Sequence, residues 1–395
     1  MSRLDSCYDL DDMREAARRH LPKGLFEFID RGAERELAAK ENIAAFQQVK
    51  LRSKFLVGLS ERDFSTEIFG KRIAMPLAIG PTGIGGLCWY QGELALARAA
   101  AAAGIPFALA ATSITPMEQV KQAGGRNWFQ LYMWKEEDLT YEILERARDI
   151  GYEALFVTVD TALGRTREYN DRNGFTDPIS LNARFVTDMA LHPRWLIGVM
   201  GRYVMSTGMP RHSNYPAKYQ VTINRGLPNK APQNSTSMTW EHIGRIRKMW
   251  PGPLVVKGIQ SGDDARRAVD QGADGVVVSN HGGRALDSAI ATLDSLPEVV
   301  AAVGDRATVL LDSGVRHGSD IVKAVAMGAK AVLIGRATLY GLAVGGEAGA
   351  TKVLKLLANQ FEKNMGYIGC RTIAELGPHV LARKSEDMQE VRLEQ

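Results

Sequence analysis

The feature that most constrains the fold of this chain is a series of eight short apolar runs separated by stretches of helical composition. Polar or glycine-containing turns bound each run. The runs are Pro76–Ile79, Phe107–Ala110, Trp128–Tyr132, Ala154–Thr158, Leu254–Lys257, Gly275–Ser279, Thr308–Asp312 and Ala331–Ile334. Continuous apolar strands that alternate with helices indicate a parallel sheet covered on both faces, because parallel pairing requires crossover helices. Eight such units predict an α/β fold of the (β/α)8 TIM-barrel type.

A doubly wound open sheet is the competing architecture. It would place a glycine-rich phosphate-binding turn directly after its first strand. Residues 80–86 contain four glycines but match that turn only loosely. The number of strand–helix units therefore favours the barrel.

Two segments fall outside the repeat, and we expect residues 1–395 to form one domain around it. Residues 1–70 are expected to form an α-helical N-terminal extension, with helical patterning around Asp11–Arg19 and Leu25–Phe46. Residues 174–240 are expected to form a long insertion after the fourth strand. A connection of that length inside a compact domain is usually functional or disordered.

Composition excludes several classes of protein. With 49 basic and 45 acidic residues the net charge is +4, which gives no general signal for nucleic-acid binding. The three cysteines, Cys7, Cys88 and Cys370, are widely spaced, so disulfides and a metal site are both disfavoured. The N-terminus has no secretory signal, and no apolar run reaches the roughly 18 to 20 residues that span a bilayer. These observations favour a cytoplasmic protein.

The insertion has an unusual composition. Between residues 177 and 230 it holds two acidic residues, Asp177 and Asp188, and many apolar ones. Its seven basic residues are Arg184, Arg194, Arg202, Arg211, Lys218, Arg225 and Lys230. Basic charge with apolar anchors favours peripheral docking on anionic lipid, at the inner face of the cell membrane, from which electrons could pass to a quinone. A mobile lid over the substrate pocket is the alternative.

Polar residues that close the apolar runs are the candidates for chemistry, because a parallel barrel gathers its active site at the C-terminal ends of its strands. They are Gln130, Tyr132, Thr158, Asp160, Lys257, Ser279, His281, Arg284, Asp312, Gly335 and Arg336. The strongest motif is the hexapeptide Ser279–Arg284. His281 can serve as a general base, since its ordinary pKa lies near neutral pH. Arg284 offers a planar fork for a carboxylate.

Three further residue groups complete the predicted site. The segments 312–316 and 334–336 follow consecutive strands and predict a phosphate site built from backbone N–H groups and arginines. Asp160 is the best candidate to orient His281 and stabilise its imidazolium form. Lys257 closes an apolar strand, where a cation could lie against a reduced cofactor; a snorkelling lysine is the alternative.

With these motifs assembled, the sequence resembles the FMN-dependent α-hydroxy acid dehydrogenase and oxidase family from about residue 21 to residue 370. Residues 279–284, 312–324 and 334–343 carry the resemblance. Residues 80–83 and 191–195 are most similar to the mandelate-oxidising members. The resemblance implies that FMN is the cofactor and that the enzyme is a homotetramer.

Residue by residue, the resemblance implies roles for most of the candidates. His281 would be the base, Asp160 its partner, Arg167 and Arg284 the carboxylate clamp, and Tyr132 a contact of the substrate hydroxyl. The implied flavin contacts are Pro81, Thr82, Gly83, Gln130, Thr158, Lys257 and Ser279. The implied ribityl and phosphate contacts are Asp312, Ser313, Gly314, Arg316, Gly335 and Arg336.

Three positions depart from the usual family pattern or bear on its variants. Phe28 stands where the family has a carboxylate-binding tyrosine, so a substrate hydrogen bond is lost. Ala110 stands where many members have a flavin-contacting serine. At the position of Gly83, dehydrogenases of the family more often have glycine and oxidases alanine. Glycine here favours an electron acceptor other than oxygen.

The expected activity is FMN-dependent oxidation of an (S)-2-hydroxy acid to the 2-oxo acid, with His281 removing either the C2 proton or the hydroxyl proton. Phe28, Trp134, and either Met200 or Met205 favour a mandelate-like acid, with a quinone as electron acceptor. An oxygen-using oxidase, a monooxygenase that decarboxylates its product, and a non-catalytic barrel that binds a phosphate ligand are the alternatives.

Overall fold

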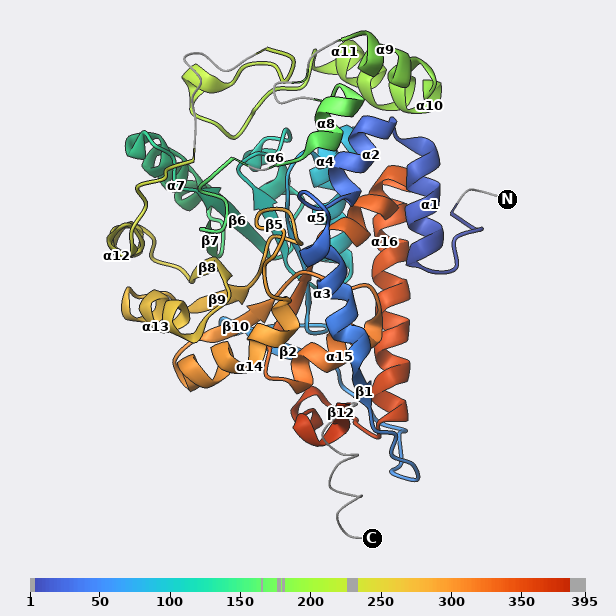
Figure 1. The fold of residues 1–395 in the computed structure, drawn as a ribbon, viewed down its shortest axis with the longest axis vertical. Helices are drawn as coiled ribbons and strands as arrows, with labels where there is room; N and C mark the ends of the chain where they lie inside the picture. The colour runs from blue at the N-terminus through green and yellow to red at the C-terminus, as the bar shows by residue number, and fades with distance from the viewer. Residues whose placement is uncertain (1–3, 165, 176–178, 180–181, 226–233, 384–395) are drawn as a thin grey trace.

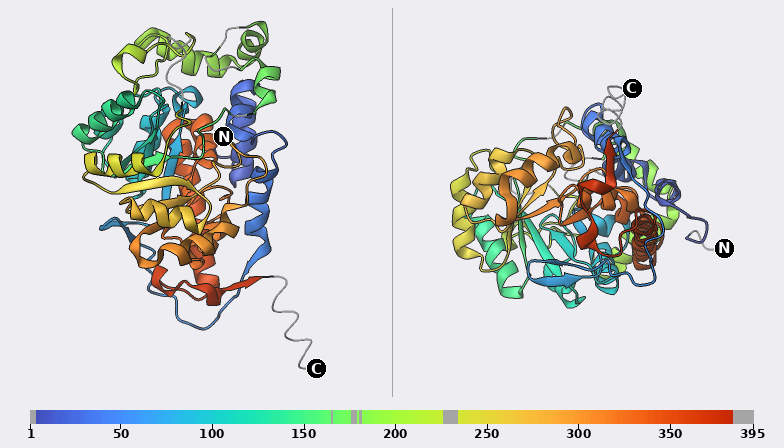
Figure 2. Two further views of the ribbon diagram at one scale, coloured as in Figure 1. Left: turned by 60° about the vertical axis from the view of Figure 1, so that its left-hand side comes forward. Right: turned by 90° about the horizontal axis from the view of Figure 1, so that it is seen from below.

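A closed barrel of eight parallel strands forms the centre of the computed structural model, which describes residues 4–164, 166–175, 179, 182–225 and 234–383 (Figure 1, Figure 2). The strands are β4 (Leu77–Thr82), β5 (Phe107–Ala110), β6 (Asn127–Tyr132), β7 (Leu155–Thr158), β8 (Leu254–Ile259), β9 (Gly275–Val278), β10 (Thr308–Leu311) and β11 (Ala331–Ile334). They pair in chain order, and β11 pairs with β4 to close the ring. The predicted TIM barrel is confirmed, and the open-sheet alternative is wrong because the ring has no edge.

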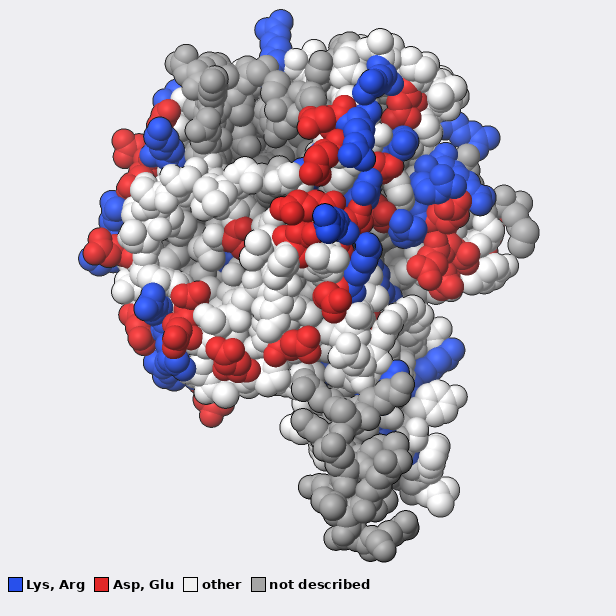
Figure 3. All heavy atoms as spheres, viewed as in Figure 1, with Lys and Arg blue, Asp and Glu red and all other residues white. Residues whose placement is uncertain are grey.

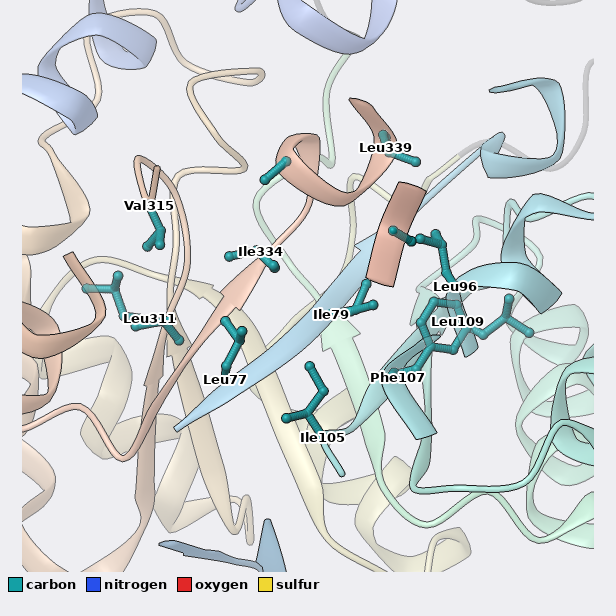
Figure 4. Packing of buried hydrophobic residues seen from close by; sticks show 14 of the residues in the cluster. Leu77, Ile79, Leu96, Ile105, Phe107, Leu109, Leu311, Val315, Ile334 and Leu339 are labelled. Atoms are coloured by element: carbon teal, nitrogen blue, oxygen red, sulfur yellow. The ribbon is translucent and has the colours of Figure 1, made fainter. Parts of the chain in front are cut away.

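Helices between the strands form the outer layer of the barrel. They are α4 (Gly85–Cys88), α5 (Gly92–Ala102), α6 (Met117–Gln122), α7 (Glu137–Ile150), α12 (Trp240–Met249), α13 (Gly262–Asp270), α14 (Thr292–Val303), α15 (Gly318–Ala326) and, after the last strand, α16 (Arg336–Tyr367). The short α8 (Glu168–Asn173), after β7, packs against α2 instead. Apolar side chains pack between this layer and the strands, among them Ile79, Leu96 and Leu109 (Figure 4). This burial supplies the main driving force for folding.

The interior of the barrel is filled at the N-terminal ends of its strands. Trp128 and Phe156 stack there with ring centroids 5.1 Å apart. Ile68 and Ile73 close this end, and both are 1% exposed. They belong to a two-stranded hairpin of β2 (Thr66–Ile68) and β3 (Lys71–Ile73). The opposite, C-terminal end of the barrel is therefore the one with room for a ligand.

The N-terminal extension is helical only as far as Gln48. Its helices are α1 (Leu10–His20), α2 (Lys23–Asp30) and α3 (Leu37–Gln48). The helical pattern predicted over residues 25–46 is broken between α2 and α3, where Glu34 and Glu36 have left-handed backbones. Beyond α3, β1 (Val49–Leu51) pairs with β12 (Leu381–Arg383), and the β2–β3 turn is left-handed at Phe69 and Gly70. The expectation of helix to residue 70 is thus wrong for its last part.

The insertion after β7 folds into short helices at the end of the molecule that also carries α2 and α8 (Figure 1). They are α9 (Ala183–Ala190), α10 (Pro193–Trp195) and α11 (Arg202–Ser206), with a π-helical turn at Leu196–Gly201 between α10 and α11. Trp195 anchors them to the barrel through a 2.7 Å hydrogen bond from Nε1 to the Leu87 carbonyl. In the described part of the chain, no helix has the length and apolar character needed to cross a membrane.

Candidate active site

The histidine predicted as a base lies against the aspartate predicted as its partner. Nδ1 of His281 is 2.8 Å from Oδ1 of Asp160, and both side chains are less than one-fifth exposed. Because a carboxylate only accepts, Nδ1 donates, and Nε2 is the ring nitrogen suited to proton exchange with a substrate. Gly258 permits this approach, since a Cβ there would lie 2.7 Å from the Asp160 Cβ.

Backbone strain concentrates at this histidine. His281, Gly282 and Gly283 all have positive φ values, of 57°, 69° and 69°. Such a conformation is uncommon for a residue with a side chain and must be held by its surroundings. Two hydrogen bonds hold it, from His281 N to Ser279 Oγ at 3.1 Å and from Gly282 N to Ser313 Oγ at 2.8 Å. The turn thereby projects the imidazole from the end of β9.

Two arginines share one aromatic ring beside the histidine. The guanidinium carbons of Arg167 and Arg284 lie 5.3 Å and 5.1 Å from the centroid of Phe28. Arg284 Nη1 also donates to the carbonyls of Ile29 and Arg31, at 3.2 Å and 2.9 Å. Cation–π contact orients both cations, and these carbonyls hold Arg284 in addition. Phe28 therefore packs against the predicted clamp although it lacks a hydroxyl.

A buried lysine forms the floor of the site. Lys257 Nζ lies 2.8 Å from both Asp312 Oδ2 and Ser279 Oγ. Burial disfavours its charged form, but the nearby carboxylates of Asp312 and Asp160 outweigh that effect and raise the pKa of Lys257. The positive charge of Lys257 is thus favoured at the strand ends. Its side chain is only 4% exposed, which contradicts the snorkelling alternative.

Two features fit the polar groups of a flavin. Gln130 Nε2 donates to Thr158 Oγ1 at 2.9 Å, while its buried Oε1 accepts from no residue that the structure describes. A buried acceptor normally has a donor, and the N–H of a flavin ring can supply one.

Nearby, burial and the positive charge of Arg316 lower the pKa of Arg336. Gly335 is the N-cap of α16, so cations and a helix N-terminus converge as a phosphate requires.

One cavity of about 1100 Å³ joins these groups at the C-terminal end of the barrel. The predicted residues that line it are Phe28, Pro81, Thr82, Gly83, Tyr132, Arg167, Lys257, His281, Arg284, Asp312, Ser313, Gly314, Arg316, Gly335 and Arg336. Gln130, Thr158, Asp160 and Ser279 lie directly behind this lining and contact it or one another. Ala110 is buried outside the lining, two residues before Thr112, which belongs to it.

Part of the cavity wall was not predicted from the sequence, and another part was predicted wrongly. The insertion contributes Phe175, Ile179, His212, Tyr215 and Ile223 to the lining, and Trp134 faces them as predicted. Met200 and Met205 do not line the cavity, and Met205 is 78% exposed. Met205 points to solvent, whereas Met200 is half-buried and packs against the hydrophobic core, so their predicted pocket role is wrong. No local motif marks His212 or Tyr215.

A sequence profile described as FMN-dependent dehydrogenase matches residues 17–383. The chain belongs to the FMN-dependent dehydrogenase family. Among the relatives of this chain is (S)-mandelate dehydrogenase of Pseudomonas putida, 42% identical, with 95% of this chain and 93% of the relative aligned. L-lactate oxidase of a Nostoc strain is 40% identical over 95% of this chain and 98% of the relative. L-lactate dehydrogenase of Caulobacter vibrioides is 40% identical over 94% and 97%.

Solved structures show the same relationship. The crystal structure of the monotopic membrane protein (S)-mandelate dehydrogenase superposes with a TM-score of 0.89 at 42% identity, covering 96% of this chain and 100% of that one. Mandelate oxidase with (S)-2-phenylpropionate gives a TM-score of 0.79 at 35% identity, covering 95% and 98%. The protein is therefore an oxidoreductase acting on 2-hydroxy acids, and its cofactor is FMN.

Proposed function

We propose that this dehydrogenase oxidises an aromatic (S)-2-hydroxy acid of the mandelate type to the 2-oxo acid and passes the electrons to a quinone. The observation that carries the proposal is the 2.8 Å pair of His281 and Asp160 in one cavity with Arg167 and Arg284. A 2-hydroxy acid presents a carboxylate next to the carbon that is oxidised. A base beside a carboxylate clamp is the arrangement that this substrate needs.

Each side chain has a distinct task in the proposed reaction. Arg167 and Arg284 bind the substrate carboxylate, and Tyr132 contacts the substrate hydroxyl. His281 takes up a proton at Nε2, and Asp160 stabilises the imidazolium that results. Bound FMN supplies the oxidising power by accepting two electrons. Lys257 keeps a buried positive charge at the strand ends, which stabilises developing negative charge there.

Aromatic walls support the choice of an aromatic substrate. Phe28, Trp134, Phe175 and Tyr215 all line the cavity. Phe28 and Phe175 are in contact, with centroids 5.2 Å apart, and Trp134 and Tyr215 are 4.9 Å apart in an edge-to-face arrangement. Ring faces and edges of this kind bind a phenyl group better than a methyl group or a hydrogen atom.

An anaerobic screen of flavin reduction tests the substrate. We expect mandelate and 4-hydroxymandelate to bleach the flavin of the holoenzyme with a specificity constant at least about tenfold above lactate, because a buried phenyl group contributes more than 1.4 kcal/mol. Glycolate should be slower still. Faster bleaching by lactate or glycolate would contradict the aromatic assignment. A protein whose flavin no 2-hydroxy acid reduces would support the non-catalytic alternative, and product analysis would reveal a decarboxylating monooxygenase.

The insertion supports peripheral membrane contact. Its helices expose Leu191, Ile197, Val204 and Met205, which are 61% to 78% exposed. Arg184, Arg194 and Arg202 lie on the same short helices. Figure 3 shows this end of the molecule, over α9 and α10, to be mostly uncharged with scattered basic side chains. Apolar anchors among basic residues favour an anionic bilayer surface, where a quinone is available. The related (S)-mandelate dehydrogenase is described as a monotopic membrane protein.

Co-sedimentation with vesicles of phosphatidylcholine and phosphatidylglycerol tests this contact. The double variant Leu191→Glu, Ile197→Glu should bind such vesicles at least about tenfold more weakly, since burial of each apolar side chain contributes roughly 2 kcal/mol to binding. Phe55→Glu with Leu56→Glu is the control, because these apolar residues are 70% and 104% exposed but lie outside the insertion. Flavin reduction should be unchanged in both. Equal vesicle binding by the two double variants would favour a lid over a docking surface.

An oxygen-using oxidase is the second candidate function, because L-lactate oxidase is as similar as the lactate dehydrogenases. Oxygen consumption that matches product formation in the absence of a quinone would favour it. The family resemblance also supports a homotetramer, which we carry forward as a proposal.

A further inference from the structure

We propose that Asp188, in the insertion, is a positioning residue for the substrate-binding Arg284 and the phosphate-binding Arg336, and that it acts through α2. The inference rests on the proposed function, because it requires Arg284 to bind the substrate carboxylate. Asp188 lies in α9, outside the cavity lining. Three observations connect it to the site.

The first observation is at the N-terminal end of α2. The first N–H groups of a helix have no partner within it, and a capping side chain normally satisfies them. The N-cap here is Pro22, which makes no such bond. Asp188 replaces it from a distant part of the chain, with Oδ1 accepting from Lys23 N and Oδ2 from Gly24 N, both at 3.0 Å. A carboxylate is also favoured there by the helix dipole.

The second observation is at the C-terminal end of the same helix. The carbonyl of Ile29 accepts from Arg284 Nη1 at 3.2 Å and from Arg336 Nε at 3.1 Å. The carbonyl of Arg31 accepts from Arg284 Nη1 at 2.9 Å and from Arg336 Nη2 at 3.1 Å. Both guanidinium groups are therefore oriented by a carbonyl of the last turn of α2 and by that of its C-cap residue, Arg31, where the helix dipole favours cations.

The third observation is the length of α2 and its close fit to the insertion. Its eight residues form a rod of about 12 Å. A Cβ at Gly24 would lie only 2.9 Å from the Cβ of Phe175, so α2 has no room to shift toward the insertion. Asn173 Nδ2 donates to Glu27 Oε2 at 2.7 Å along the same side. Because α2 is a short, rigid helix, a displacement at its Asp188 end moves the carbonyls and the Phe28 ring at its other end.

The arrangement joins two parts of the molecule with different tasks. Leu191, one of the exposed apolar residues of the proposed docking surface, follows Asp188 by three residues. His192 Nδ1 lies 2.8 Å from the Asp188 carbonyl and secures the turn between them. The insertion therefore contains both Asp188, which supports the carboxylate clamp through α2, and the proposed docking surface. Hydrogen bonds weaken steeply when their geometry is lost, so a loosened α2 should weaken carboxylate binding first.

The test compares Asp188→Ala, Asp188→Asn and Arg284→Ala holoenzymes with wild type. Asp9→Ala is the matched control, because Asp9 caps α1 through Asp12 N at 2.8 Å and that helix does not end at the arginines. Benzoylformate, a 2-oxo acid that cannot reduce the flavin, is titrated by the change in flavin absorbance. Anaerobic reduction by mandelate then gives the limiting rate, and thermal unfolding reports stability.

We expect Asp188→Ala to raise the dissociation constant of benzoylformate about tenfold while the limiting rate stays within about twofold of wild type. Asp188→Asn keeps one acceptor oxygen, so its dissociation constant should lie between those of wild type and Asp188→Ala. Asp9→Ala should bind benzoylformate as tightly as wild type, even if its unfolding temperature falls as much as that of Asp188→Ala. Wild-type binding by Asp188→Ala, or an equal loss in Asp9→Ala, would overturn the inference. If Arg284→Ala also binds benzoylformate normally, the proposed clamp fails as well; if Arg284→Ala alone loses binding, only the role of Asp188 fails.

Discussion

His281→Ala should lower the limiting rate of anaerobic flavin reduction by a factor of about 10² to 10⁴, the usual contribution of a general base. The reason is the short contact with Asp160, 2.8 Å, which fixes the ring and stabilises its protonated form. Flavin content should stay near wild type, because the predicted phosphate ligands, Arg316 and Arg336, are unchanged in this variant. Stopped-flow bleaching by mandelate measures the rate, and the absorbance ratio of flavin to protein measures occupancy.

His212→Ala is the control for this prediction. His212 also lines the cavity, but it stacks on Tyr215 with centroids 4.9 Å apart and belongs to the insertion. The loss of that ring should alter substrate affinity while leaving the limiting rate nearly intact. Rapid bleaching in His281→Ala, or equal losses of rate in the two variants, would show that the base lies elsewhere.

The barrel could be predicted from sequence because its strands are buried on both faces. A strand such as Phe107–Ala110 is an unbroken apolar run, and the structure places β5 at those same residues. The β2–β3 hairpin was missed for the opposite reason. Only Ile68 and Ile73 of its residues are fully buried, and the turn depends on a left-handed Phe69 that no pattern marks.

The candidate site was predictable to the extent that strand ends determine it. His281, Lys257 and Asp312 each follow an apolar run, and a barrel brings such positions together whatever their separation in the chain. The contacts that orient them were not predictable. The left-handed turn of His281 depends on Gly282 N donating to Ser313 Oγ across 31 residues, and Arg284 donates to the Ile29 carbonyl, a backbone group without any sequence signal. Met200 and Met205 were misassigned because an apolar residue in an insertion can face either the cavity or the outside.

Lys257→Met should destabilise the protein by about 3 to 5 kcal/mol, the usual consequence of removing one partner of a buried ion pair. Nζ of Lys257 lies 2.8 Å from Asp312 Oδ2, and the Asp312 side chain is only 14% exposed. Because the pKa of Lys257 is raised in the folded state, its positive charge is present at pH 7, and its contribution to stability is lost only as the pH rises above about 10.4, the ordinary lysine value. Urea unfolding at pH 7 measures the loss of unfolding free energy.

A second substitution separates this structural effect from the chemical one. Adding Asp312→Asn to Lys257→Met removes the unpaired carboxylate, so the double variant should recover at least about 1 kcal/mol of unfolding free energy. It should recover none of the rate of flavin reduction, since the cation that stabilises negative charge is still absent. Recovery of both quantities together would mean that Lys257 acts only by neutralising Asp312. Recovery of stability alone would show that the positive charge of Lys257 itself contributes to flavin reduction.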